Sequence, residues 1–168
     1  MARLFFAVWP APAAARELAR IGEALAALVG GKPMPAEKLH MTLVFLGSLG
    51  EEEKAAAALA ASQVQGRRIA MTIDSVGSFR RSRVGWAAPS SPGVALAELE
   101  ARLAGAMRSR GFTLEDRAFT PHVTLVRKID KPVPRAPVQA VEWRSKAFTL
   151  VESTGDGRYE VRESWGLN

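Results

Sequence analysis

The sequence predicts an α+β protein with mainly antiparallel sheet, folded as one domain over residues 1–168. Segments with a helical spacing of apolar residues are mixed with short, strongly apolar segments that are typical of strands. Several predicted strands are joined by turns of a few residues, which connect antiparallel strands but are too short for the crossover that parallel strands need. No GxGxxG or GxxxxGKS/T motif is present, which excludes the commonest nucleotide-binding loops.

The first half of the chain is predicted to form two strands and two helices. Pro10 and Pro12 interrupt the first apolar run, which is therefore more typical of a buried strand than of a secretion signal. Apolar residues then recur every three and four positions, as on one face of a helix, and an acidic cluster favours the start of a second helix. The predicted elements are a strand at 4–9, a helix over 13–28 ended by Gly30–Gly31, a strand at 40–46 closed by Gly47, and a helix over 51–64.

The second half repeats this order more loosely. A basic turn over 80–83 joins two predicted strands, and Gly111 ends a helix with apolar residues on one stripe. A proline-rich stretch over 131–138 is too short for an interdomain linker, and TGDG at 154–157 is typical of a hairpin turn. The predicted elements are strands at 67–79 and 82–88, a helix over 94–110, and strands at 122–127, 141–153 and 158–167.

The composition is that of a globular protein with a basic surface. Hydrophobic residues make up 48% and charged residues 24% of the chain, and no apolar run is long enough to cross a membrane. The net charge of +6 favours a polyanionic partner such as nucleic acid, although an arginine-rich solvated surface would give the same balance. The absence of cysteine excludes disulfides, thiolate catalysis and cysteine-based zinc sites, and it fits a cytoplasmic location.

Both histidines of the chain lie in nearly the same five-residue motif, His-Met-Thr-Leu-Val from His40 and His-Val-Thr-Leu-Val from His122. Side chains alternate between the two faces of a strand. Each motif therefore places an imidazole and a hydroxyl on one face, roughly 7 Å apart, as His40 with Thr42 and as His122 with Thr124. Core packing explains the repeated leucine and valine but requires neither histidine nor threonine, so the matched pair indicates function.

Two His–Thr pairs fit general acid–base catalysis better than other chemistries. Two histidines without cysteine or a carboxylate cluster make a poor metal site, and a Ser–His–Asp triad needs only one histidine. A neutral imidazole can take a proton while a protonated one gives a proton, because the pKa of histidine lies near neutrality. The hydroxyls and backbone amides can hold phosphoryl oxygens. The sequence therefore predicts in-line displacement at the phosphorus of a cyclic phosphodiester, without metal or other cofactor.

Two H-x-T motifs with this separation resemble the 2H phosphoesterase superfamily, and the surrounding sequence resembles the RNA 2′,3′-cyclic phosphodiesterases, also known as 2′-5′ RNA ligases. The resemblance covers nearly the whole chain, including RLFFAVWP, LHMTLVFLG, SFRRSRVGWAAP, FTPHVTLVRK and LVESTGDGRYEVRESWGL. It implies two pseudo-symmetric lobes, each an antiparallel sheet with helices outside, around a central cleft. It also implies opening of a terminal RNA 2′,3′-cyclic phosphate to a 2′-phosphate, with a weak reverse reaction that joins RNA ends through a 2′-5′ bond.

Carried over to matching positions, the resemblance makes His40 the proton donor to the leaving 3′-oxygen and His122 the base that activates water. Thr42 and Thr124 would bind the phosphate. The spacing of the residues does not by itself distinguish the two imidazoles.

Arg127 also matches the family motif, as a phosphate or substrate contact. Strict alternation places it on the face opposite His122, so this role requires that the strand bend or bulge after Val126 or that the side chain reach around the sheet end. The alternative is a surface arginine. Phe45 follows His40 at the same spacing as Arg127 follows His122. Strict alternation therefore places Phe45 on the face opposite His40, and we expect it in the core.

Other residues near the motifs have less specific assignments. The basic turn carries three arginines that either contact an RNA backbone or are solvated at a hairpin tip. Two aromatic residues flank the turn; one could stack on a base, but we expect core positions. The only tyrosine lies in the last predicted strand, and family position is the only argument for its role. These residues are Arg80, Arg81, Arg83, Phe79, Trp86 and Tyr159.

The expected partner is RNA with 2′,3′-cyclic phosphate ends, with tRNA fragments among the candidates, and we expect a monomeric cytoplasmic enzyme that binds no membrane. Two alternatives stay open. The same site could act on small cyclic nucleotides or 2′-5′-linked oligonucleotides, or the protein could capture RNA ends without turnover. Arginine or lysine would serve pure binding better than paired histidines.

Overall fold

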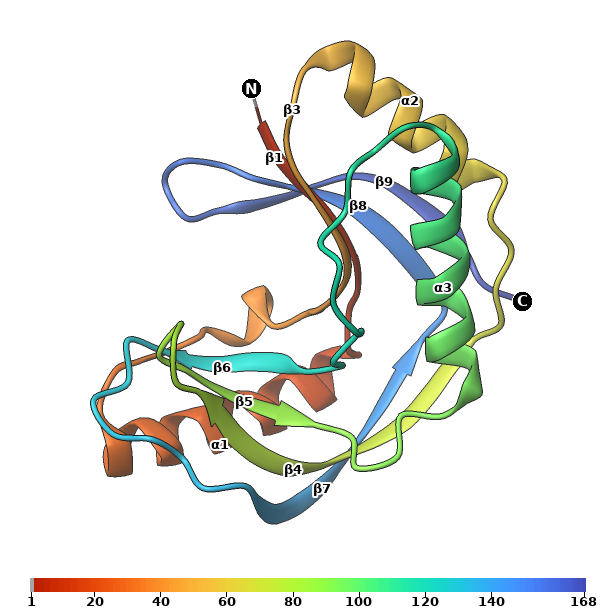
Figure 1. Cartoon of the computed structure of the whole chain (residues 1–168). Helices are drawn as coiled ribbons and strands as arrows, with labels where there is room; N and C mark the ends of the chain where they lie inside the picture. Colours follow the sequence, from red (N-terminus) through yellow and green to blue (C-terminus); the bar gives the residue numbers. More distant parts are fainter. Residues whose placement is uncertain (1) are drawn as a thin grey trace.

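The computed structural model describes residues 2–168, in which two antiparallel sheets and three α-helices form. The α+β class with two sheet-based lobes is therefore confirmed. Sheet A consists, in spatial order, of β3 (Met41–Leu49), β1 (Ala2–Val8), β8 (Ala147–Ser153) and β9 (Tyr159–Gly166). Sheet B consists of β2 (Lys32–Pro33), β6 (Val123–Arg127), β5 (Val84–Ala88), β4 (Ile69–Phe79) and β7 (Ala136–Ser145) (Figure 1).

Two of the helices pack against the sheet that does not contain the strand before them in the chain. α1 (Pro12–Val29) packs on sheet B, whereas α2 (Glu51–Ser62) and α3 (Val94–Ser109) contact each other and β3 of sheet A (Figure 1). Gly22 permits the close approach of α1 to β6, because a Cβ there would lie 3.1 Å from the Leu125 carbonyl oxygen. Each lobe thus combines elements from both halves of the chain, so the repeated motif does not mark two separately folded halves.

The region between the lobes departs from the sequence prediction. The single strand predicted at 141–153 is two strands, β7 and β8, which belong to different sheets and meet at Lys146. The buried Ser145 hydroxyl anchors this crossing, because it donates to the Trp9 carbonyl at 2.7 Å and accepts from the Trp143 indole at 2.9 Å. β7 also begins inside the predicted proline-rich connector, and the sequence prediction lacked β2 and the short 3₁₀ helix η1 (Ala36–Lys38).

One hydrophobic core joins the sheets and helices, and a small second cluster lies on the other face of sheet A. Phe5, Ala7 and Val151 form this second cluster, with Trp9 and Tyr159 packed against it. In the part of the chain that the structure describes, no helix is long and apolar enough to cross a membrane.

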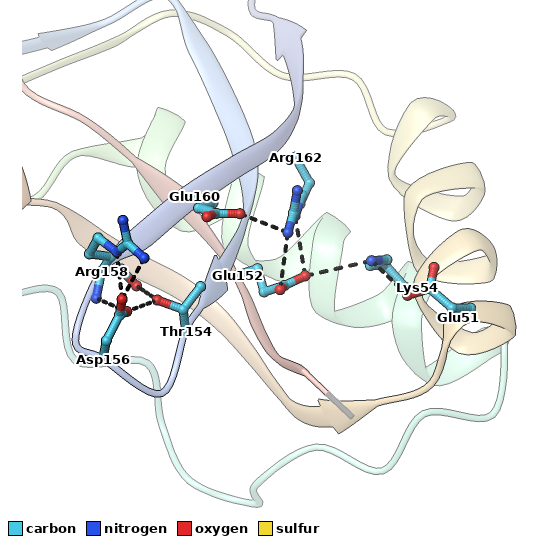
Figure 2. Close-up of polar contacts among 8 residues, drawn as sticks. All are labelled: Glu51, Lys54, Glu152, Thr154, Asp156, Arg158, Glu160 and Arg162. Atoms are coloured by element: carbon cyan, nitrogen blue, oxygen red, sulfur yellow. Dashed lines mark hydrogen bonds and ion pairs between the residues drawn. The ribbon is translucent and has the colours of Figure 1, made fainter.

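An ion-pair network ties α2 to β8 and β9 of sheet A (Figure 2). Lys54 of α2 lies 3.5 Å from Glu152 of β8, and Arg162 of β9 lies 3.1 Å from the same carboxylate and 2.8 Å from Glu160. Such solvent-exposed pairs each contribute little to the free energy of unfolding. Their structural consequence is to brace the β8–β9 hairpin, whose turn is itself tied by hydrogen bonds among Thr154, Asp156 and Arg158.

Candidate active site

The two histidines immediately precede strands of different sheets and are held in the same way. The His40 Nδ1 atom lies 2.8 Å from the Lys38 carbonyl oxygen, and the His122 Nδ1 atom lies 2.7 Å from the Thr120 carbonyl oxygen. A carbonyl can only accept a hydrogen bond, so each Nδ1 carries a proton and donates it. Each neutral imidazole therefore presents an unprotonated Nε2 that can exchange a proton with a ligand.

Each H-x-T motif contains a β-bulge at its leucine. In β6, Thr124 and Val126 pair with neighbouring residues of β5, so Leu125 is an extra residue with no partner there. Its carbonyl instead accepts a hydrogen bond from the Met34 amide at 2.8 Å. The extra residue reverses the alternation of side chains beyond it, and Arg127 therefore shares the face of Thr124. The bulge that this role requires is present, but it lies before Val126.

The same irregularity occurs in β3. Thr42 and Val44 pair with neighbouring residues of β1, which leaves Leu43 as the extra residue. Val44 turns into the core at 6% exposure, whereas Phe45 lies on the face of Thr42 and is 40% exposed. The prediction of a core position for Phe45 was therefore wrong. Phe45 and Arg127 occupy equivalent positions in the two motifs.

A cleft of about 920 Å³ brings the two motifs together. Thr42 of sheet A and Thr124 and His122 of sheet B all line this cleft, so hydroxyl groups from both sheets face the same space. Arginine and aromatic side chains complete the walls. Among these lining residues are Phe45, Phe79, Arg80, Arg81, Arg108 and Arg117.

His40 lies in an aromatic enclosure. The Phe5 ring stacks on the imidazole at 5.0 Å between centroids, the Tyr159 ring meets it edge-on at 5.0 Å, and Trp9 lies at 5.2 Å. Burial lowers the pKa of His40 from its ordinary value of 6.5 to about 4, with further lowering by the charges of Arg127 and His122, although the bond to the Lys38 carbonyl opposes the shift. His40 is therefore neutral at pH 7 in the free protein.

Arg127 reaches toward His40 from the other sheet. Its Nη2 atom donates a hydrogen bond to the Tyr159 hydroxyl at 3.2 Å, and its positive charge contributes to the lowered pKa of His40. No chemical pattern in the sequence indicated Tyr159, and neither Phe5 nor Trp9 was predicted as a site residue. All three aromatic residues lie far from His40 in the sequence, and only the fold brings them to its imidazole.

His122 has fewer aromatic neighbours than His40 and lies near an arginine. It contacts one aromatic ring, that of Phe79, edge-on at 4.9 Å. Burial is the main cause that lowers the pKa of His122, the charge of Arg117 adds to it, and the hydrogen bond to the Thr120 carbonyl opposes it. Phe79 lines the cleft, so its predicted core position was wrong, whereas Trp86 is buried at 7% exposure as expected.

The arginines of the basic turn divide into two groups. Arg80 and Arg81 line the cleft. Arg83 folds back onto the chain, where its Nε atom donates to the Ile129 carbonyl at 3.0 Å and its Nη2 atom pairs with Asp130 at 3.4 Å. Within residues 2–168, no three histidine or carboxylate side chains lie close enough together to hold a metal ion.

The model of the 2′-5′ RNA ligase superfamily matches residues 9–157 of the chain. The protein belongs to this superfamily. The resemblance inferred from the H-x-T motifs is therefore confirmed at the level of the family.

Relatives in this superfamily align with most of the chain. The RNA 2′,3′-cyclic phosphodiesterase of Escherichia coli is 33% identical over 142 residues, which cover 82% of this chain and 80% of that protein. The RNA 2′,3′-cyclic phosphodiesterase of Thermus thermophilus is 31% identical over 167 residues, which cover 90% of this chain and 81% of that protein.

Solved structures of superfamily members share the whole fold. The crystal structure of Escherichia coli LigT complexed with 3′-AMP is 30% identical and superposes with a TM-score of 0.86, covering 99% of this chain and 98% of that one. LigT complexed with phosphate is 28% identical with a TM-score of 0.80 and the same coverage. LigT thus binds both a nucleotide and a phosphate group on the fold that this chain adopts.

Proposed function

We propose that the protein hydrolyses terminal RNA 2′,3′-cyclic phosphates to 2′-phosphomonoesters without a metal ion. The observation that carries this proposal is the matched pair of imidazoles, each with Nδ1 held by a carbonyl two residues earlier and Nε2 free. The two precede strands of opposite sheets, and Thr42 and Thr124 line one cleft together with His122. The names of the relatives support the same activity.

The two imidazoles divide the proton transfers of an in-line displacement between them. One Nε2 takes a proton from water as the water oxygen bonds to phosphorus. The protonated Nε2 of the other gives a proton to the 3′-oxygen as its bond to phosphorus breaks, and the product keeps its phosphate on the 2′-oxygen. The resemblance assigns the donor role to His40 and the acceptor role to His122. Because His40 is neutral in the free protein, its donor role requires that a bound phosphate anion raise its pKa.

The phosphoryl oxygens have donors on both sides of the cleft. The Thr42 and Thr124 hydroxyls can donate to the non-bridging oxygens, and the Arg127 guanidinium can neutralise their negative charge. The bulge at Leu125 supports the assignment of Arg127, because without it the guanidinium would lie on the far face of the sheet.

An RNA strand is the substrate that the cleft favours over a small cyclic nucleotide. Arg80, Arg81 and Arg117 extend the basic surface beyond His122 and its phosphate-binding neighbours. A cyclic mononucleotide has no additional phosphate that could pair with these arginines, whereas an RNA strand carries one at each further nucleotide. The same geometry supports weak 2′-5′ ligation, in which an RNA 5′-hydroxyl replaces water, its oxygen bonds to phosphorus, and the 3′-oxygen leaves and takes a proton. The cytoplasmic location and the monomeric state stay predictions from the sequence.

The direct test is to incubate an RNA that ends in a 2′,3′-cyclic phosphate with the protein and excess EDTA. We expect hydrolysis at an undiminished rate, and a higher kcat/KM on an oligonucleotide than on the matching cyclic mononucleotide. Hydrolysis that requires added metal would contradict the proposal. Tight binding without turnover would indicate an RNA-end-binding module instead, and a preference for the mononucleotide would indicate a small-nucleotide phosphodiesterase.

A further inference from the structure

Tyr159 is the residue that joins the two sheets at the site. It begins β9 of sheet A, and its hydroxyl accepts a hydrogen bond from Arg127 of β6 in sheet B at 3.2 Å. Its ring meets the His40 imidazole edge-on with centroids 5.0 Å apart, and it meets Phe5 edge-on at 5.7 Å. Tyr159 therefore contacts both the imidazole and the guanidinium of the proposed reaction, although neither sequence motif contains it.

We propose that Tyr159 is a positioning residue of the reaction: its hydroxyl holds the Arg127 guanidinium over the phosphate site while its ring holds His40. This inference rests on the proposed function and adds a residue to it. An unbound arginine side chain has many rotamers and loses their entropy when it binds an anion. A guanidinium already held by the tyrosine hydroxyl loses less of that entropy.

The same contact couples the protonation of His40 to the occupancy of the phosphate site. The charged or titratable groups that face His40 are Arg127 and His122 from the opposite lobe and Tyr159 from β9, and the Lys38 carbonyl holds its Nδ1. With the site empty, Arg127 is a nearby positive charge that disfavours the imidazolium. A phosphate anion that pairs with Arg127 reverses this effect. His40 therefore gains its proton when an anion is bound, as the donor role requires.

The test combines two variants with a readout that does not depend on activity. Because the chain has two histidines, NMR resolves both imidazoles, and a His122→Asn variant assigns them. We expect Tyr159→Phe, which keeps the ring and removes the hydroxyl, to raise the pKa of His40 by roughly half a unit as Arg127 is released. We expect Arg127→Met to raise it at least as much, and Tyr159→Phe to add nothing in the Arg127→Met background.

Kinetics supply the second readout. With cyclic-phosphate RNA, Tyr159→Phe should lower kcat/KM roughly 10-fold, the usual effect of one lost hydrogen bond to a charged group, and should shift the acid limb of the pH profile. Val161→Thr, an exposed position on the same strand, is the matched control and should behave as wild type. Wild-type pKa and kcat/KM in a folded Tyr159→Phe protein would overturn this inference. Absence of turnover by the wild-type protein would overturn the proposed function instead.

Discussion

The two H-x-T motifs have the same local geometry but different surroundings. In both, a carbonyl two residues earlier holds Nδ1, a threonine follows on the same face, and a bulge at the leucine reverses the alternation of side chains beyond it. His40 is enclosed by three aromatic rings, whereas His122 contacts one and opens onto arginines. The comparison teaches that the repeat provides two imidazoles held in the same local geometry, and that residues outside the repeat give each imidazole a different environment.

Removal of either imidazole tests whether the two motifs have equal importance for catalysis. We expect His40→Ala and His122→Ala each to lower kcat on cyclic-phosphate RNA by 10²–10⁴-fold, the usual contribution of a general acid or base. Thermal unfolding of each variant serves as the control for folding. A variant that keeps more than about a tenth of the wild-type kcat would show that the corresponding histidine does not transfer a proton in the reaction.

The stability of the protein should depend on pH more through His40 than through His122. The unfolded chain binds a proton to His40 below pH 6.5, whereas the folded protein binds it only near pH 4. The unfolded state therefore binds more protons in this window, and stability falls as the pH falls from 6.5 to 4. The contribution of His40 is at most about 3 kcal/mol. Urea unfolding of His40→Phe should show a weaker pH dependence than that of His122→Phe.

Arg127 and Phe45 are the equivalent positions at which the motifs differ in chemistry. Arg127→Met should lower kcat/KM roughly 10–100-fold, because it removes a charged hydrogen-bond donor from the phosphate. Phe45→Leu should change kcat/KM by about twofold or less, as expected at a partly exposed position. Equal effects of the two substitutions would contradict the assignment of the phosphate contact to the second motif.

The pH profile tests the pair without deciding which imidazole is the donor. The proposed reaction requires one protonated and one neutral imidazole, so kcat/KM should be highest between the two pKa values of the free protein. Both pKa values lie below 6.5. We therefore expect the maximum below pH 6.5 and a decline toward tenfold per pH unit above it. A maximum at pH 8 would contradict this description of the site.

The sequence was sufficient for the chemistry of the motifs but not for their full geometry. The alternation of side chains pairs each histidine with its threonine, because that relation spans two residues of one strand. It fails beyond Leu43 and Leu125, since a bulge depends on contacts from other elements, such as the Met34 amide that binds the Leu125 carbonyl. The positions of Phe45 and Arg127 follow from the bulges and could not be predicted.

Contacts between the two lobes also could not be predicted from the sequence. The crossing from β7 to β8 depends on the buried Ser145, whose partners are a distant backbone carbonyl and a nearby indole. Tyr159 meets His40 and Arg127 only because β9 joins sheet A and the two sheets face one cleft. No pattern of neighbouring residues indicates such contacts.

The most direct test of the central claim is to identify the product on an RNA that ends in a 2′,3′-cyclic phosphate. The proposed reaction breaks the bond between phosphorus and the 3′-oxygen, so the product should carry a 2′-phosphate and a free 3′-hydroxyl, formed in the presence of EDTA. Formation of a 3′-phosphate, or of no product, would contradict the proposed role of the paired histidines.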